Sequence, residues 1–159
     1  MSIIPSPTSW RSGPMMLDDE DVVSVCRIGL FQNLSPKDIM FLVRVSHTVI
    51  ADEGATVISQ NSVGDFFYII VDGLLRVRVN AGGKSIVVAY LTRGQYVGEK
   101  AIMEGTLRGA TCEAARETRL VRVPGFTFRR IMSRPENRGA FERVNTTRAK
   151  SNARLGVKS

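Results

Sequence analysis

The chain has 159 residues, of which 43% are hydrophobic and 23% are charged, and its formal net charge is +7. These values are ordinary for a globular protein, and the length suits one domain with short tails. No apolar run approaches the roughly 18 residues that span a membrane, and the first residues do not resemble a signal peptide. We therefore expect a cytoplasmic protein without membrane insertion, free or attached to a cytoskeletal or other large assembly.

The positive charge is concentrated towards the C-terminus. Residues 143–159 contain no acid and five basic residues: Arg143, Arg148, Lys150, Arg154 and Lys158. Such a segment can contact an acidic protein surface or nucleic acid, but it is more often a solvated end of the chain. Nucleic acid is the weakest expectation for a partner, because the few residues after the last expected helix cannot form a DNA-reading helix-turn-helix.

Helices are predicted over about residues 18–46, after an irregular arm rich in Ser and Pro at 1–17. The acidic run at 18–21 is typical of a helix start. The helix that follows is expected to place on one face Val22, Val23, Cys26 and Leu30. Ser35-Pro36-Lys37-Asp38 is a second start signal, because Ser is a favoured N-cap and Pro suits the first helical position. The second helix is expected to end near Val45.

From His47 onward the segments become short, rich in Val, Ile and aromatic residues, and bounded by Gly and Asp. Strands are expected at 48–50, 56–58, 66–71, 74–79, 85–91 and 118–123. Asp72-Gly73 and Gly82-Gly83 predict tight turns between strands. This spacing indicates a mainly β, α+β fold, in which an antiparallel β jelly-roll barrel at about 47–123 is flanked by helices.

Further helices are predicted after the strands, over about 126–149. Residues 126–132 have a helical pattern, and Pro135 marks the start of a last helix that reaches about Lys150. The apolar stripe of this last helix is thin, so the helix needs a surface to lie against. The expected organisation is an arm at 1–17, one domain at 18–149 and a basic tail at 150–159.

The stretch GEKAIMEGTLRGAT, residues 98–111, has the composition of a binding site. Gly98 and Gly105 permit backbone angles that other residues resist, and residues 99–104 are long enough for a short helix. Arg108 is a forked, permanently charged donor suited to a phosphate, whereas Glu99 can accept hydrogen bonds from sugar hydroxyls. A ribose phosphate would satisfy both side chains; an ion pair between Glu99 and Arg108 on a loop is the alternative.

This stretch resembles the phosphate-binding cassette of cyclic-nucleotide-binding domains, of the type in the regulatory subunit of cAMP-dependent protein kinase and in the catabolite activator protein. The family pattern runs roughly Gly-Glu-Leu-Ala-Leu, a short gap, then Gly-Thr-Pro-Arg-Ala-Ala-Thr. The chain has Gly98-Glu99-Lys100-Ala101-Ile102 and then Gly105-Thr106-Leu107-Arg108-Gly109-Ala110-Thr111. Residues 30–35, 57–73 and 91–99 resemble further blocks of the family, so the similarity extends from about Leu30 to Val144.

The resemblance implies a role for each matching residue of the cassette. Glu99 would hold the ribose 2′-hydroxyl and Arg108 the cyclic phosphate. Backbone groups would complete the cradle at Gly98, Ala101, Gly109 and Ala110. The family also carries an apolar side chain that covers the base, for which Phe141 is the first candidate and Val144 the second. Packing of the last helix on the barrel explains both of these residues equally well.

Ligand binding would move the cassette through a hinge at Ile102, Phe126 and Ile131. The chain departs from the family pattern at Lys100, which is normally apolar, and at Leu107, which is normally Pro. Gly109 stands where members that prefer cGMP often carry Thr, which favours cAMP.

No catalytic constellation is apparent, and the one histidine, His47, lacks the His and Asp neighbours of a metal-dependent phosphodiesterase. We therefore expect neither an enzyme nor a metal or cofactor site. The first hypothesis is a stand-alone cyclic-nucleotide receptor with cAMP as its favoured ligand. It signals to an unknown protein partner by movement of its C-terminal helices. The second is a structural domain that keeps the fold without a nucleotide and is anchored in a larger assembly by its terminal arms.

Overall fold

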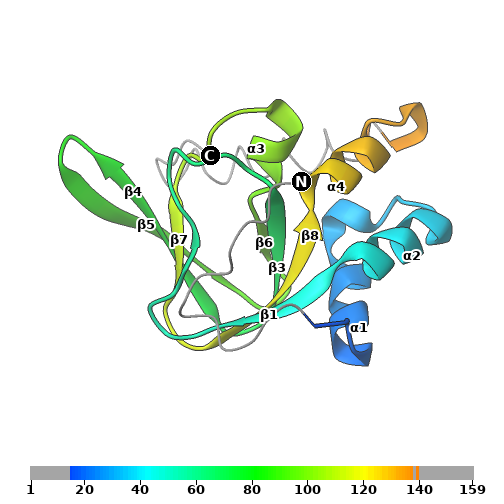
Figure 1. Cartoon of the computed structure of the whole chain (residues 1–159), viewed down its shortest axis with the longest axis horizontal. Coiled ribbons are helices and arrows are strands. Elements are labelled where there is room, and N and C mark those ends of the chain that lie inside the picture. Colours follow the sequence, from blue (N-terminus) through cyan, green and yellow to red (C-terminus); the bar gives the residue numbers. More distant parts are fainter. Residues whose placement is uncertain (1–14, 138, 140–159) are drawn as a thin grey trace.

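A computed structural model describes residues 15–137 and 139 of the chain (Figure 1). In chain order the elements are α1 (Asp19–Arg27), the 3-10 helix η1 (Gly29–Phe31), α2 (Pro36–Val45), β1 (His47–Ala51), β2 (Thr56–Ile58), β3 (Phe66–Asp72), β4 (Leu74–Ala81), β5 (Lys84–Thr92), β6 (Tyr96–Val97), α3 (Glu99–Glu104), β7 (Thr111–Ala114), β8 (Thr118–Pro124), α4 (Gly125–Met132) and the 3-10 helix η2 (Pro135–Asn137).

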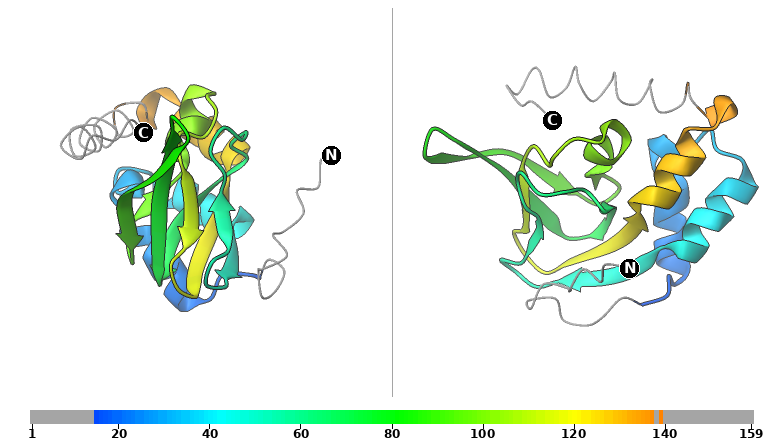
Figure 2. Two further views of the ribbon diagram at one scale, coloured as in Figure 1. Left: turned by 90° about the vertical axis from the view of Figure 1, so that its left-hand side faces the viewer. Right: turned by 45° about the horizontal axis from the view of Figure 1, so that its top comes forward.

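The strands form two four-stranded antiparallel sheets, ordered β1-β8-β3-β6 and β2-β7-β4-β5. Helices α1, α2 and α4 lie beside the first sheet, and the β4–β5 hairpin extends away from them (Figures 1 and 2). The predicted jelly-roll type of mainly β fold with flanking helices is confirmed. No helix of the described part of the chain combines the length and apolar character that a membrane crossing requires.

Strand β3 is buried on both of its faces, which explains its nearly continuous apolar sequence. Phe67, Ile69 and Val71 pack into the core beneath the helices. Tyr68 and Ile70, which alternate with them, pack into the core between the two sheets. The strand therefore joins the two cores, and it also carries the backbone that reaches the candidate site described below.

The core beneath the helices is built around three phenylalanines from distant parts of the chain. The ring centroids of Phe67 and Phe128 are 4.5 Å apart, and that of Phe31 lies 6.0 Å from Phe67 and 6.2 Å from Phe128. Offset and edge-on ring contacts of this kind add stability beyond the burial of their area. They fix α4 against β3 and against the N-terminal helical segment.

Helix α2 begins as predicted, because the Ser35 hydroxyl accepts a hydrogen bond from the Asp38 backbone N–H at 3.2 Å. The predicted buried face of the first helix is wrong in part. Leu30 is buried as expected and Val22 is half-buried, but Val23 and Cys26 are exposed. The residues of α1 that face the core are Asp21 and Val25. A hydrophobic pattern could not place an aspartate inside, so the cause lies in what binds it.

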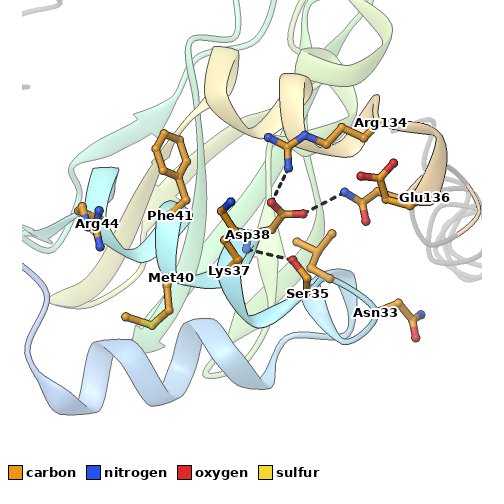
Figure 3. A pocket seen from close by; sticks show the side chains of 11 residues that line it. Asn33, Ser35, Lys37, Asp38, Met40, Phe41, Arg44, Arg134 and Glu136 are labelled. Atoms are coloured by element: carbon orange, nitrogen blue, oxygen red, sulfur yellow. Dashed lines mark hydrogen bonds and ion pairs between the residues drawn. The ribbon is translucent and has the colours of Figure 1, made fainter.

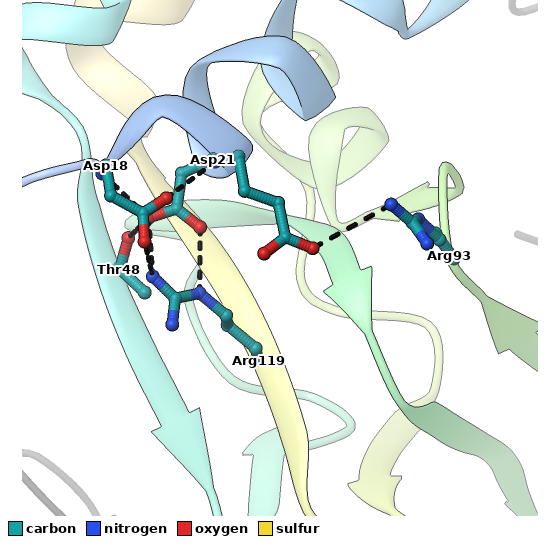
Figure 4. Close-up of polar contacts among 6 residues, drawn as sticks. Asp18, Asp21, Thr48, Arg93 and Arg119 are labelled. Atoms are coloured by element: carbon teal, nitrogen blue, oxygen red, sulfur yellow. Dashed lines mark hydrogen bonds and ion pairs between the residues drawn. The ribbon is translucent and has the colours of Figure 1, made fainter.

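Asp21 is fully buried and is held by a two-pronged ion pair with Arg119 of β8 (Figure 4). Nε and Nη2 of Arg119 donate to the two carboxylate oxygens of Asp21, each at 2.9 Å. The Thr48 hydroxyl donates to the same carboxylate at 2.5 Å, and Arg119 also reaches Asp18 at 2.7 Å. A buried carboxylate is tolerated only with such partners, and this network attaches α1 to β1 and β8.

We expect Arg119→Ala to lower the free energy of unfolding by about 3 kcal/mol, because it leaves the buried Asp21 carboxylate without its charged partner. Arg93→Ala is the matched control, since Arg93 forms an exposed ion pair with Glu20 at 3.7 Å. Exposed pairs contribute only about 0–1 kcal/mol. Urea denaturation of both variants measures the difference; equal losses would contradict a structural role for the buried pair.

The Asp21 network also makes stability depend on pH. Burial raises the pKa of Asp21, but the hydrogen bonds from Arg119, Thr48 and the Asp18 backbone outweigh it and hold the pKa below its ordinary value. A carboxyl with a lowered folded pKa stabilises the protein above its unfolded pKa, and that contribution is lost as pH falls. Between about pH 5 and pH 2, stability should therefore decline less steeply in Asp21→Asn than in the wild type. Identical slopes in urea titrations would refute this assignment.

Candidate functional site

All six predicted binding residues line one cavity of about 370 Å³: Gly98, Glu99, Ala101, Arg108, Gly109 and Ala110. The first residues of α3 and the loop after it form one side of this cavity. Small-molecule sites commonly have volumes of about 300–1,000 Å³. The cassette residues are thus brought together around a space of suitable size, although binding itself stays a prediction.

Arg108 is the central cation of the cavity, and its side chain is only 6% exposed. Its Nη1 donates to the Gly98 carbonyl at 2.6 Å, and its Nη2 donates to the carbonyl of Phe66 at the start of β3. Two further backbone bonds tie Arg108 to the loop before β3: its N–H donates to Ser62 and its carbonyl accepts from Asn61. The guanidinium is therefore held by backbone carbonyls of two segments, and the backbone of Arg108 is held by the loop before β3.

Two glycines leave the space that the Arg108 guanidinium occupies. A Cβ at Gly98 would lie 2.6 Å from Nη1, and a Cβ at Gly64 would lie 3.1 Å from Cζ. Gly98 also has a φ of 98°, in the left-handed region that side chains resist. Together with Gly105, whose φ is 66°, it bounds the short helix α3 that the sequence predicted at 99–104.

Glu99 is the first residue of α3 and is only 7% exposed, so the cavity holds buried groups of both charges. Burial lowers the pKa of the Arg108 guanidinium, and Tyr68, Cys112 and Glu99 act against that shift. An arginine stays protonated at neutral pH even so. Lys100, one of the departures from the family pattern, is half-buried and also lines the cavity.

The opposite wall is apolar and comes from strands, and sequence reasoning did not identify it. Its residues belong to β2, β4, β5, β6 and β7: Ile58, Val77, Val88, Ala89, Leu91, Val97 and Cys112. These side chains form no motif, since they are spread over more than fifty positions. Only the pairing of the strands could reveal that they face the cassette.

The contact between the cassette and α4 differs in part from the prediction. Ile102 is buried in the same core as Ile131, but Phe126 is 79% exposed and its side chain lies outside that core. Helix α4 meets the cassette through Gly125 instead, where a Cβ would lie 3.0 Å from Cδ1 of Ile102. The two proposed base-capping residues, Phe141 and Val144, lie outside the described residues.

Within residues 15–137 and 139, no group of three or more His, Cys, Asp or Glu side chains could hold a metal ion. A larger hollow of about 850 Å³ lies between α2 and the segment after α4 (Figure 3). None of the cassette residues lines this hollow.

A family model described as "Cyclic nucleotide-binding domain" matches residues 48–135. The chain belongs to the cyclic nucleotide-binding domain family. A cAMP-dependent protein kinase regulatory subunit from Schizosaccharomyces pombe is 34% identical over 110 residues, which cover 69% of this chain and 24% of that relative. The chain spans only about a quarter of the length of this and the next curated relatives that it matches.

Two similar solved structures show the fold. The regulatory domain of Toxoplasma gondii PKA with cAMP has a TM-score of 0.71 at 18% identity and covers 81% of this chain and 48% of that one. The regulatory subunit of a cAMP-independent protein kinase A from Trypanosoma brucei has a TM-score of 0.70 at 17% identity, with coverages of 81% and 46%. The same fold is thus found in both, and the ligand must be argued from the site.

Gly98→Ala should displace the Arg108 guanidinium from the Gly98 carbonyl, because the new Cβ needs the space of Nη1. Gly94→Ala is the matched control: Gly94 has a similar φ of 85°, but a Cβ there would meet nothing within 4 Å. In both variants, strain of the left-handed backbone should lower the free energy of unfolding by about 1–2 kcal/mol. Only Gly98→Ala should shift the guanidinium NMR signal of Arg108, and an unmoved signal would contradict the packing described here.

Proposed function

We propose that the chain is a non-catalytic cyclic-nucleotide receptor whose preferred ligand is cAMP. The observation that carries this proposal is the meeting of two buried, oppositely charged side chains, Arg108 and Glu99, in one cavity with an apolar opposite wall. A nucleotide has three parts that complement these features: an anionic phosphate for the arginine, a hydroxyl-bearing sugar for the glutamate and a flat base for the apolar wall. The membership in the cyclic nucleotide-binding domain family supports the same reading.

The residues present fit such a ligand. Two of the five N–H groups of the Arg108 guanidinium donate to backbone carbonyls. The other N–H groups can donate to the phosphate oxygens. Charge-assisted bonds of this kind contribute roughly 1.5–3 kcal/mol each. Glu99 would accept a hydrogen bond from the ribose 2′-hydroxyl, and backbone N–H groups at Ala101 and Gly109 would complete the phosphate cradle.

The preference for cAMP rests on what surrounds the base. The strand wall offers aliphatic side chains and Cys112, which suit an adenine ring through burial of apolar area. Gly109 supplies no hydroxyl group for the additional polar edge of guanine. A cytoplasmic location, where cAMP acts as an internal messenger, is part of this proposal.

The proposed output is a movement of the C-terminal helices that a partner protein detects. Ile102 of α3 lies directly against Gly125 at the start of α4, so a shift of the cassette towards a bound phosphate is transmitted to α4. A ligand can drive this movement only if it binds the shifted state more tightly than the resting state.

The test is thermal unfolding with cAMP, with cGMP and without ligand. Nucleotide at about 100 times its Kd should raise the melting temperature by roughly 8 °C. Arg108→Lys keeps the charge but loses the fork, and Glu99→Gln loses the acceptor charge, so each should weaken cAMP binding at least about tenfold.

Matched controls are Arg78→Lys and Glu113→Gln, which make the same chemical changes in an ion pair outside the cavity. These two variants should bind cAMP as the wild type does. A larger shift with cGMP would overturn the stated preference alone. An unchanged melting temperature with both nucleotides at millimolar concentration would refute the receptor proposal and favour the structural alternative.

A further inference from the structure

The outer face of α2 carries an apolar centre with a basic residue at each end. Lys37, Met40, Phe41 and Arg44 are all exposed. Met40 and Phe41 lie on either side of the line from Lys37 to Arg44, because each is three or four positions from both cations. Met40 is 53% exposed and Phe41 is 48% exposed. Large apolar side chains that are exposed close together, rather than singly, mark interaction surfaces.

This face of α2 forms one side of the hollow of about 850 Å³, and Figure 3 shows the residues that line it. The other side is the segment that links α4 to η2, with Arg134 and Glu136. Arg134 donates from Nη1 to the Asp38 carboxylate of α2 at 2.5 Å, and the Asn137 amide donates to the same carboxylate at 3.4 Å. These bonds hold the two sides together, so the groove is a built feature and not a gap between loose segments.

The charges of the groove select the chemistry of its occupant. Three cations and two carboxylates line it, and the Asp38 carboxylate is buried and already engaged by Arg134 and Asn137. The exposed charges of the lining beside this pair are the cations Lys37 and Arg44, at the two ends of the apolar centre, and the carboxylate Glu136 on the other side of the groove. An occupant that complements this pattern has apolar side chains in the middle and acids on either side.

The two ends of this chain do not have that composition. Residues 1–14 contain no acid and one arginine, and residues 138–159 contain one acid, Glu142, against six basic residues. Like charges placed against Lys37 and Arg44 oppose binding. The occupant must come from elsewhere.

We infer that the groove between α2 and the α4–η2 segment is a docking site for an acidic, amphipathic helix of a partner protein. Such a helix would lay its apolar stripe over Met40 and Phe41 and place carboxylates against Lys37 and Arg44. The features of this groove do not depend on nucleotide binding. Only its use as the output of a nucleotide receptor rests on the function proposed above.

The experiment selects binders from a displayed library of random peptides, each about 16 residues long, on the full-length wild-type chain. Synthetic copies of the enriched peptides are then titrated by fluorescence anisotropy. Enriched peptides should be net acidic and carry apolar residues at helical spacing. The affinity should fall at least about tenfold in the double variant Met40→Ser and Phe41→Ser.

The matched control is Ile86→Ser with Val87→Ser on β5, which removes two apolar side chains of similar exposure, 53% and 45%. It should change the affinity less than about twofold. Reversing the end charges with Lys37→Glu and Arg44→Glu should abolish binding of the acidic peptides, and peptides with Lys in place of their acids should then bind that variant. Thermal melts confirm that each variant is folded.

The inference is overturned if no peptide is enriched, if enriched peptides lack acids, or if they bind the α2 variants as tightly as the wild type. It is also overturned if the chain forms dimers that the α2 substitutions dissolve, because the occupant is then a second copy. Arg108→Lys should retain peptide binding while losing the response to cAMP. If the wild type binds peptide but neither nucleotide, the proposed function is refuted and the docking site stands.

Discussion

The grip of the buried Arg108 guanidinium on two backbone carbonyls is the interaction on which the site depends. It joins the cassette at Gly98 to the first residue of β3, Phe66. The strand that supplies this second carbonyl is buried on both faces and belongs to both cores of the molecule. A charge that is costly to bury is thus fixed in part by a strand that is buried on both faces, and it lines a cavity with room for an anion.

Buried charge recurs as the means by which this small domain orders its parts. Asp21 attaches α1 to the first sheet through Arg119 and Thr48, and Asp38 attaches α2 to the end of α4 through Arg134. Each carboxylate has partners from distant elements, so it specifies a single arrangement as well as contributing stability. The apolar cores supply the bulk of the driving force, and these polar contacts determine how the helices sit on the sheet.

The sequence predicted most of the fold because alternation and turn residues mark six of the eight strands. Strands β6 and β7 were missed, because β6 has only two residues and β7, Thr111–Ala114, contains no Val, Ile or aromatic residue. The buried face of α1 was wrong in part because Asp21 turns inward to meet an arginine almost one hundred residues away. The charged side of the cavity was predictable from the cassette motif, whereas its apolar wall is assembled by strand pairing and leaves no local signal.

The position of a bound phosphate is the most direct test of this site, and a crystal structure of the full chain grown with cAMP would show it. The phosphate oxygens should accept hydrogen bonds from Arg108 at about 2.7–2.9 Å, with the ribose 2′-hydroxyl on Glu99 and the base against the strand wall. A nucleotide bound elsewhere, or bound in the cavity without its phosphate on Arg108, would contradict this binding mode.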